Sequence, residues 1–385
     1  MKKLAIIGAS YLQLPLIEKA KALGYETHVF AWEAHDVGEE AADVFRPISI
    51  VEQDAILDVC RELGVCGVCT VGTDLGAVTA NYVAHGLGLP CNSPEASFRA
   101  SNKHAMRCAF EEGGDPSPRS VRVEAGSDLA KATEGLAYPL IVKPTDRSGS
   151  RAITRLESPE GLAEAVQAAV AVSFEKKAVI EEYAEGTEYS VECASQKGEH
   201  HLLAVTRKYT TGAPHFIETG HIEPAPLSPS LQQTIRRVVF HALDSLGITD
   251  SISHTELKIR GDGKISLIEI GGRMGGDCIG THLVPLTTGV DFVKCAIDLA
   301  VGNPLDLTPA AGTPSTGMAL VRFVLGQKDL DALEAVEREH PELLVGKSGI
   351  TPFDHPVEDS GSRYGCFILH SRRPAALEPY LPEED

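Results

Sequence analysis

Two glutamates stand at matching positions in a predicted β-hairpin, and this feature constrains the chain more than any other. The runs 255–259 and 264–270 are rich in residues that favour strands, and they flank a Gly-Asp-Gly turn at 261–263. Pairing of the two strands places Glu256 beside Glu269. The hairpin therefore predicts two carboxylates at short range.

These carboxylates form a candidate site for a divalent cation. Because side chains alternate along a strand, we expect Leu267 and Glu269 on one face and the two isoleucines, 268 and 270, on the other. Neighbouring carboxylates in a partly buried site repel, so one would be protonated unless a cation lies between them. Paired oxygen ligands, completed by phosphate oxygens, suit Mg²⁺, and Arg273 adds a planar cation for a phosphate or carboxylate. The alternative is an exposed hairpin with solvated glutamates.

The length and charge of the chain bound its class. A chain of 385 residues is longer than a single hydrophobic core ordinarily accommodates, so we expect two or three domains. The net charge of -19 argues against a nucleic acid or an anionic membrane surface as the main partner. No run approaches the length of a membrane span, and the start of the chain leads into a short apolar strand rather than a signal peptide.

The cysteines indicate a reducing compartment. There are nine, an odd number, and no secretory segment accompanies them, so we expect a cytoplasmic protein. Cys66 and Cys69 have C-x-x-C spacing, but the surrounding run 65–71 is typical of a buried strand. We therefore interpret both as core residues rather than a redox or metal site.

The N-terminal region has the pattern of a parallel α/β domain. Apolar strands are predicted at 3–8 and 26–32, with a helix at 14–23 between them. A dinucleotide-binding domain is the alternative, and Glu33 lies where a ribose-binding acid would stand. The turn after Gly8 lacks the second and third glycines of G-x-G-x-x-G, which disfavours a nicotinamide enzyme.

Two lysines and a loop rich in small residues follow. Lys103 lies in a predicted helix at 97–112, and a Gly/Pro-rich linker comes next. Lys143 ends a predicted strand and leads into the loop 145–151, which we call the phosphate loop. Such loops offer backbone N–H groups to phosphate oxygens, although a plain surface turn has a similar composition.

Residues 178–192 predict a strand, a short connector and a second strand. The connector can offer backbone groups to the edge of an adenine, and Glu188 can reach ribose hydroxyls; a β-turn with exposed acids is the alternative. Near the C-terminus, strands are predicted at 316–325 and 365–370, with a helix at 329–339.

The order of these motifs resembles that of the ATP-grasp superfamily of carboxylate–amine ligases, of the L-amino acid ligase or biotin carboxylase kind. The resemblance covers about residues 1–305. It implies an α/β fold with an N-terminal parallel-sheet domain at 1–95, a two-lobed α+β ATP-grasp domain at 96–305 with a lid at about 116–186, and a small α/β segment at 306–385.

The resemblance also implies a role for each motif. Lys103 and Lys143 are similar to lysines that contact the phosphates of ATP, and Arg273 is similar to an arginine that contacts the transferred phosphate or the substrate carboxylate. Glu256 and Glu269 match the ligands of Mg²⁺, with Mn²⁺ as the alternative ion. The further nucleotide contacts that it implies are Ser148, Gly149 and Ser150 of the phosphate loop, Glu181, Glu182, Tyr183 and Ala184 at the adenine, and Glu188 at the ribose.

The sequence departs from the family pattern at two places. Gly271 stands where the family often has an asparagine that ligates metal, so a second ion would be held more weakly or by water. The phosphate loop has one glycine, Gly149, beside Asp146 and Arg147, so its closure can differ.

The implied activity is ATP-dependent formation of an amide or peptide bond through an acyl phosphate, with release of ADP and phosphate. The implied partners are a small carboxylate, for which Arg273 beside a glycine turn favours an amino acid, and an amine. Alternatives are a carboxylase-type or formyltransferase-type enzyme and a non-catalytic nucleotide-binding module. The C-terminal segment either shapes the substrate pocket or forms a homodimer contact, and the sequence identifies neither substrate.

Overall fold

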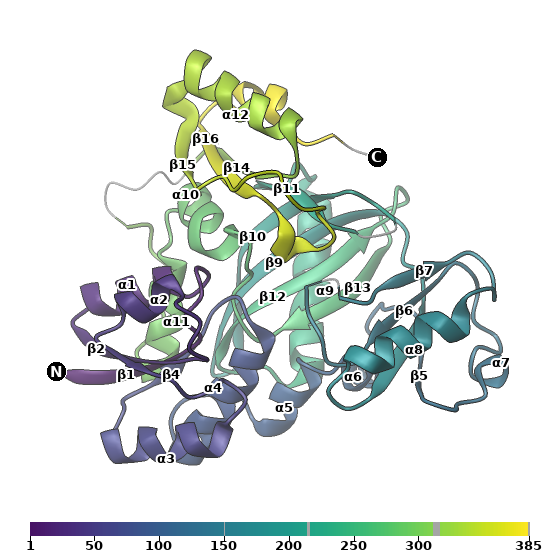
Figure 1. Cartoon of the computed structure of the whole chain (residues 1–385), viewed down its shortest axis with the longest axis horizontal. Helices are drawn as coiled ribbons and strands as arrows, with labels where there is room; N and C mark the ends of the chain where they lie inside the picture. Colours follow the sequence, from purple (N-terminus) through teal and green to yellow (C-terminus); the bar gives the residue numbers. More distant parts are fainter. Residues whose placement is uncertain (150, 214–215, 311–315, 384–385) are drawn as a thin grey trace.

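The computed structural model describes residues 1–149, 151–213, 216–310 and 316–383, and these form three β-sheets (Figure 1). A parallel sheet at the N-terminus and a small antiparallel sheet lie on opposite sides of a long eight-stranded sheet. This arrangement confirms the predicted α/β fold class. Within the described residues, no helix is both long enough and apolar enough to span a membrane.

The N-terminal sheet has the strand order β3-β2-β1-β4, and its predicted parallel arrangement is confirmed. Its elements are β1 (Lys2–Ile7), α1 (Leu14–Ala22), β2 (Tyr25–Phe30), α2 (Val37–Ala41), β3 (Val44–Arg46), α3 (Gln53–Leu63), β4 (Val68–Cys69) and α4 (Asp74–Leu87). Helices cover both faces, which explains why the strands are apolar on both faces. Cys69 is buried, Cys66 is half-buried, and the nine cysteines form no disulfide. Because α4 follows β4, Asp74 lies at the sheet edge where ligands of such folds bind.

The single helix predicted at 97–112 is wrong in extent. The structure has two helices here, α5 (Pro94–Arg99) and α6 (Lys103–Gly113). Asn102 separates them, because its side chain accepts hydrogen bonds from the backbone N–H groups of His104 and Ala105 and so caps the start of α6. Lys103 is therefore the first residue of a helix rather than part of a helix interior.

The segment that the resemblance assigns to a lid, about 116–186, contains the small antiparallel sheet, with the order β5-β8-β6-β7, and we keep the name lid for it. Its elements are β5 (Ser120–Glu124), α7 (Leu129–Ala132), β6 (Leu140–Pro144), β7 (Thr154–Leu156), α8 (Leu162–Val172) and β8 (Lys177–Glu182). Leu162 and Val166 of α8 pack against Leu140 and Ile180 of the sheet, and this leaves the opposite face of the sheet toward the rest of the molecule.

The eight-stranded sheet has the order β13-β12-β9-β10-β11-β14-β16-β15. Its strands are β9 (Thr187–Gln196), β10 (Glu199–Thr210), β11 (Glu218–Glu223), β12 (Ser251–Ile259), β13 (Ile265–Gly271), β14 (Met318–Val324), β15 (Leu344–Lys347) and β16 (Gly365–Ser371). The associated α-helices are α9 (Pro229–Leu246), α10 (Val284–Thr288), α11 (Phe292–Val301) and α12 (Gln327–Glu339). A π-helical segment lies at Ile279–Leu283, and short 3-10 helices lie at Pro341–Leu343, Ser360–Ser362, Pro374–Ala376 and Glu378–Tyr380.

The predicted C-terminal strands and helix are confirmed as β14, β16 and α12. These strands form no sheet of their own within the described residues, because β14 pairs with β11 and extends the central sheet. The C-terminal segment is thereby joined to the strands that carry the candidate site (Figure 1).

The predicted hairpin is confirmed as β12 and β13, with Glu256 opposite Glu269. The expected alternation in β13 is wrong. Leu257 pairs with Leu267, so Ile268 is an extra residue without an opposite partner, a β-bulge. The bulge turns Leu267 into the core on the side of Ile270, and both Ile268 and Glu269 face the cleft described below.

Candidate functional site

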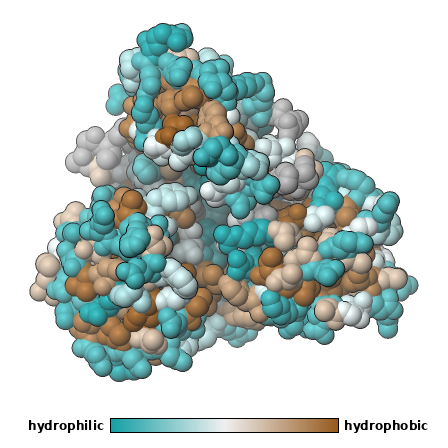
Figure 2. Space-filling model, viewed as in Figure 1, coloured by the Kyte–Doolittle hydropathy of each residue, from teal (hydrophilic) through white to brown (hydrophobic). Residues whose placement is uncertain are grey.

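A cleft lies between the lid, the central sheet and the N-terminal domain, and hydrophilic residues gather where these three lobes meet (Figure 2). Every predicted site residue that the structure describes lines this cleft. They are Lys103, Lys143, Ser148, Gly149, Glu181, Glu182, Tyr183, Ala184, Glu188, Glu256, Glu269 and Arg273. Ser150 lies outside the described residues.

At the lid end of the cleft, two cations share one buried carboxylate. Glu181 lies 2.7 Å from Nζ of Lys143 and 2.9 Å from Nε of Arg107 on α6. Burial opposes ionisation of Glu181, but Arg107 and Lys143 together hold its pKa below the usual value. Burial, with help from Arg107 and Lys103, lowers the pKa of Lys143 although Glu181 acts against this. This end carries more positive than negative charge.

Lys103 connects the phosphate loop to the hairpin. Its Nζ donates to Oε1 of Glu269 at 3.0 Å and to the backbone carbonyl of Arg147 at 2.8 Å. Burial favours the neutral amine, but Glu269 and Asp74 raise the pKa of Lys103 above its ordinary value. The lysine is therefore a fixed cation between the loop and the second acid of the hairpin.

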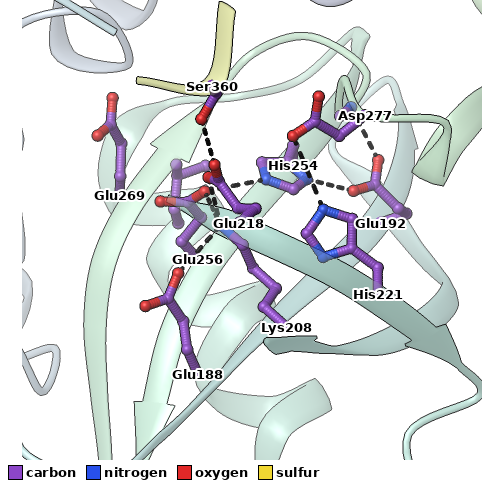
Figure 3. A network of polar contacts seen from close by, with 12 residues as sticks. Glu188, Glu192, Lys208, Glu218, His221, His254, Glu256, Glu269, Asp277 and Ser360 are labelled. Carbon is purple, nitrogen blue, oxygen red and sulfur yellow. Dashed lines mark hydrogen bonds and ion pairs between the residues drawn. The ribbon is translucent and has the colours of Figure 1, made fainter. Parts of the chain in front are cut away.

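At the sheet end, one lysine serves three carboxylates (Figure 3). Nζ of Lys208, on β10, lies 2.7 Å from Glu256, 3.0 Å from Glu188 and 3.6 Å from Glu218. Despite burial, these acids raise the pKa of Lys208 well above its usual value, and Lys208 and His254 hold the pKa of Glu256 well below its own. The expectation that one hairpin acid is protonated without a cation between the two is wrong for Glu256, because a lysine pairs with each acid separately.

A buried acid orients the histidine beside Glu256. Glu192 accepts a hydrogen bond from Nδ1 of His254 and another from the backbone N–H of Gly275 at 3.1 Å. Nε2 of His254 lies 3.4 Å from Oε1 of Glu256 (Figure 3). Burial opposes the charged ring, but Glu192 raises the pKa of His254 to about 9. His254 thus adds a positive charge that holds Glu256 in place.

Arg273 forms a bidentate ion pair with Asp74 of α4. Its Nε and Nη2 donate to the two carboxylate oxygens at 2.7 and 3.1 Å. This pair explains why glycine replaces the expected asparagine at 271. A Cβ at that position would lie 3.0 Å from Oδ1 of Asp74 and 3.1 Å from Nε of Arg273. The ion pair occupies the space that a metal-ligating side chain would need.

The connector after β8 places an aromatic residue, Tyr183, near two cations in the cleft. The guanidinium of Arg155 lies 4.3 Å from the ring centroid of Tyr183, and Nζ of Lys258 lies 4.6 Å from it. The backbone N–H of Tyr183 donates to the carbonyl of Pro139 at 2.8 Å, which fixes the path of the connector. Ile141, Ile268 and Phe216 line the same cleft, so a flat apolar ring has suitable contacts there.

Several residues of the site were not found from the sequence: Arg107, Glu192, Lys208, Glu218 and Lys258. Each is a charged residue inside a helix or strand, and each has a partner distant in sequence, although Lys208 and Glu218 are only ten residues apart. The available signal for Lys208 is that a basic pair, 207–208, interrupts the strand-like run 201–210. That signal shows that a cation is present but does not identify its partners.

The hairpin acids fit a divalent ion carried by phosphates. Glu256 and Glu269 offer hard oxygen donors on paired strands, which suits Mg²⁺. Within the part of the chain that the structure describes, no group of three or more His, Cys, Asp or Glu residues is arranged to hold a metal. The remaining ligands would have to come from a nucleotide and water, which is how Mg²⁺ is commonly bound with phosphates.

The comparisons with known proteins agree with this geometry. A model of the ATP-grasp domain matches residues 136–281. Alanine–anticapsin ligase of Bacillus subtilis is 27% identical over 285 residues, which cover 66% of this chain and 59% of that protein. Carnosine synthase 1 of Homo sapiens is 24% identical over 342 residues, which cover 81% of this chain and 40% of that protein.

A solved structure matches almost the whole chain. The L-amino acid ligase from Bacillus licheniformis superposes with a TM-score of 0.81 at 25% identity and covers 99% of this chain and 96% of that one. By contrast, the chain spans only about 60% of the length of the alanine–anticapsin ligases that it matches, between 59% and 61%.

Proposed function

Because the chain belongs to the ATP-grasp superfamily, we propose that it is an ADP-forming ligase that joins a small carboxylic acid to an amine. The observation that carries this proposal is the convergence of Lys103, Lys143 and Arg273 with Glu256 and Glu269 on one cleft. A carboxylate must approach the triphosphate of ATP in such a reaction, and fixed cations reduce the repulsion between the two anions.

The lid end supplies the positive charge for the phosphates. Lys143 and Arg107 share a single carboxylate, so this end has charge left to receive an anion. Lys103, fixed between the phosphate loop and Glu269, reaches the same space. Glu256 and Glu269 would hold Mg²⁺, which when bound neutralises phosphate charge. Tyr183 and the apolar side chains near it would hold the adenine.

The reaction would proceed in two displacements. A carboxylate oxygen of the first substrate attacks the γ-phosphorus, the bond to the ADP oxygen breaks, and an acyl phosphate forms. The nitrogen of the amine then attacks the acyl carbon, phosphate leaves, and the nitrogen loses a proton as the amide forms. Positioning and charge stabilisation by the side chains above suffice for phosphoryl transfer of this kind.

We propose amino acids as the carboxylate substrates. Arg273, next to the glycine pair at 275–276, lines the cleft with a planar cation, which an α-carboxylate would share with Asp74. The names of the alanine–anticapsin ligase and the L-amino acid ligase support the same class of substrate.

The nine free cysteines fit a reducing compartment such as the cytoplasm.

A panel of amino acid pairs with Mg-ATP tests the proposal. We expect ADP and phosphate to be released in equal amounts with at least one pair, and a dipeptide of the corresponding mass to appear. ADP release that requires bicarbonate and gives no amide would instead support the carboxylase-type alternative. Stabilisation by Mg-ATP without ADP release for any pair would support a non-catalytic module.

A further inference from the structure

A second cavity, of about 1220 Å³ counted to its open mouth, adjoins the cleft on the other side of the phosphate loop. Five residues line both spaces: Asp74, Lys103, Arg147, Ser148 and Glu269. The two spaces therefore meet at the Lys103–Glu269 ion pair, which the proposed function places beside the phosphates of ATP. A molecule in the second cavity can reach the reacting atoms without passing through the nucleotide's part of the cleft.

One wall of this cavity is apolar and unusually exposed. Val51, Phe98 on α5 and Phe174 after α8 line it with 56%, 55% and 54% of their surfaces exposed. Single exposed apolar residues are ordinary, but three large ones around one cavity indicate a binding surface. Leu75 and Val78 of α4 extend the wall toward the floor. A ligand with an apolar side chain would cover this surface.

The charged groups around the cavity are divided between floor and mouth. At the floor, the carboxylates of Asp74 and Glu269 are paired with Arg273 and Lys103, so no strong net charge is left there. Near the mouth, the guanidinium of Arg147 stacks over Phe174 at 4.5 Å, and its Nε is buried without a hydrogen-bond partner in the described structure. Arg147 is thus a cation that can donate hydrogen bonds to the carboxylate of a ligand.

The acids near Arg147 are already used in the fold. Asp146 accepts from the backbone N–H groups of Phe174 and Glu175 at 3.1 and 2.8 Å. Glu175 accepts from the side chain of Asn102 at 2.7 Å. These bonds hold the lid wall of the cavity and fix both carboxylates in place, although each keeps its negative charge. Arg147 and the exposed Arg151 are the cations of this wall that can meet a ligand's carboxylate.

We propose that this second cavity binds the amine substrate, and that this substrate is an α-amino acid with an apolar side chain. The inference rests on the proposed ligase function. The amino group points to the floor, where an uncharged amine is needed for attack and no strong anion keeps it protonated. The carboxylate meets Arg147, and the side chain packs against Phe98 and Phe174.

Steady-state kinetics of Phe98→Ala with a fixed, saturating carboxylate substrate test the apolar wall. We expect the KM for leucine as the amine to rise about tenfold, because a large apolar contact is lost, and the KM for glycine to change less than about twofold. Leu23→Ala is the matched control, since Leu23 is 40% exposed at the end of α1 and lines neither cavity. Equal changes for leucine and glycine would overturn the proposal.

Leucinamide, which lacks the carboxylate, tests Arg147. The wild-type protein should prefer leucine over leucinamide as the amine, and Arg147→Ala should reduce that preference about tenfold. The main-chain carbonyl that holds Lys103 is kept in this variant. An unchanged preference would show that the carboxylate does not meet Arg147.

Two further measurements separate this inference from the proposed function. Hydroxylamine in place of the amine converts an acyl phosphate to a hydroxamate, so hydroxamate formation reports the ligase function without the second cavity. Calorimetric titration of the protein with leucine, in the presence of ADP and Mg²⁺, reports the cavity without turnover. If hydroxamate forms but leucine binds equally to wild type and Phe98→Ala, the cavity assignment fails; if no hydroxamate forms but leucine binding requires Phe98, the ligase function fails alone.

Discussion

At the lid end of the cleft one carboxylate, Glu181, is shared by Arg107 and Lys143, whereas at the sheet end one cation, Lys208, is shared by Glu188, Glu218 and Glu256. The lid cluster is buried, and at the sheet end three partly exposed acids surround a buried lysine; both clusters are joined by ion pairs, yet their charge balances are opposite. Buried charges are costly unless they are compensated. Each cluster therefore has an unpaired charge of a different sign, and each can bind a ligand of the opposite charge.

The contrast indicates what each end receives. The lid end has a surplus cation and suits phosphate oxygens, while the sheet end has surplus anions and suits a metal ion or an ammonium group. Mg-ATP carries both kinds of charge, so it can complete both ends at once. The following experiments test this difference, beginning with the largest expected effect.

Replacing Lys208 with methionine should destabilise the protein most. Three carboxylates would lose their common cation, and loss of one buried partner costs about 4 kcal/mol. We expect the thermal unfolding midpoint to fall at pH 7 and to recover in part with added Mg²⁺. Lys347→Met is the control, because Lys347 and Glu337 form an exposed pair whose loss costs less than about 1 kcal/mol. A similar loss in both variants would contradict the account of the sheet end.

Replacing Glu181 with glutamine should have the reverse ligand dependence. Arg107 and Lys143 would lose their shared anion, at a cost of about 3 kcal/mol. Tripolyphosphate should stabilise this variant more than the wild type, and Mg²⁺ alone should not. Glu182→Gln, at the neighbouring and more exposed position, should be close to wild type in thermal unfolding. Stabilisation of the Glu181 variant by Mg²⁺ alone would remove the distinction between the two ends.

Replacing Glu269 with glutamine tests the hairpin acid that pairs with Lys103 and so connects the phosphate loop to the hairpin. We expect ADP release to fall at least about a hundredfold, since one charge-stabilising contact is worth on the order of 3 kcal/mol in a transition state. Circular dichroism should show an intact fold, and the exposed control Glu62→Gln should retain full activity. Near-normal ADP release by the Glu269 variant would remove the metal assignment.

Glu223, a buried acid of the same sheet, has no lysine beside it in the described structure, and its pKa is raised instead of lowered. Burial raises its pKa to about 7, although Thr287 and Thr206 donate hydrogen bonds to it. Because the folded-state pKa is raised from 4.5, its contribution to stability is complete below about pH 4.5 and is lost as the pH rises through about 7.

Glu223→Gln should therefore be more stable than the wild type at pH 8, by on the order of 3 kcal/mol at about 1.4 kcal/mol per pKa unit, with little gain at pH 4.5. Urea unfolding across pH 4.5 to 8 would measure the difference. A constant difference between the two proteins across this range would contradict the raised pKa.

The sequence predicts the local elements of the site well and their mutual contacts poorly. The register of Glu256 against Glu269 follows from a short turn and two β-rich runs, and the structure confirms it. The face of the sheet to which Leu267 points could not be predicted from the sequence. It depends on the bulge at Ile268, which arises from the pairing of the two strands and not from the residues of β13 alone.

The ion pairs could not be predicted from local sequence patterns for the same reason: they depend on contacts between separate elements. Lys208 meets acids from three other strands, and Arg273 meets Asp74 from the N-terminal domain 199 residues away in sequence. The break before Lys103 is different. Its signal, Asn102 immediately before the helix, was present in the sequence as a helix cap.

The bulge at Ile268 has a mechanical consequence. It leaves the carbonyl of Ile268 outside regular strand pairing, and Nη2 of Arg107 donates to it at 2.7 Å. The same guanidinium also contacts Glu181 at the end of β8, where the chain leaves the lid for the central sheet. Arg107 thus links the hairpin to the end of the lid. If the lid moves relative to the central sheet, we expect α7 to move farther than Lys143, because Lys143 shares Glu181 with Arg107, so a phosphate would meet the same cation in each position.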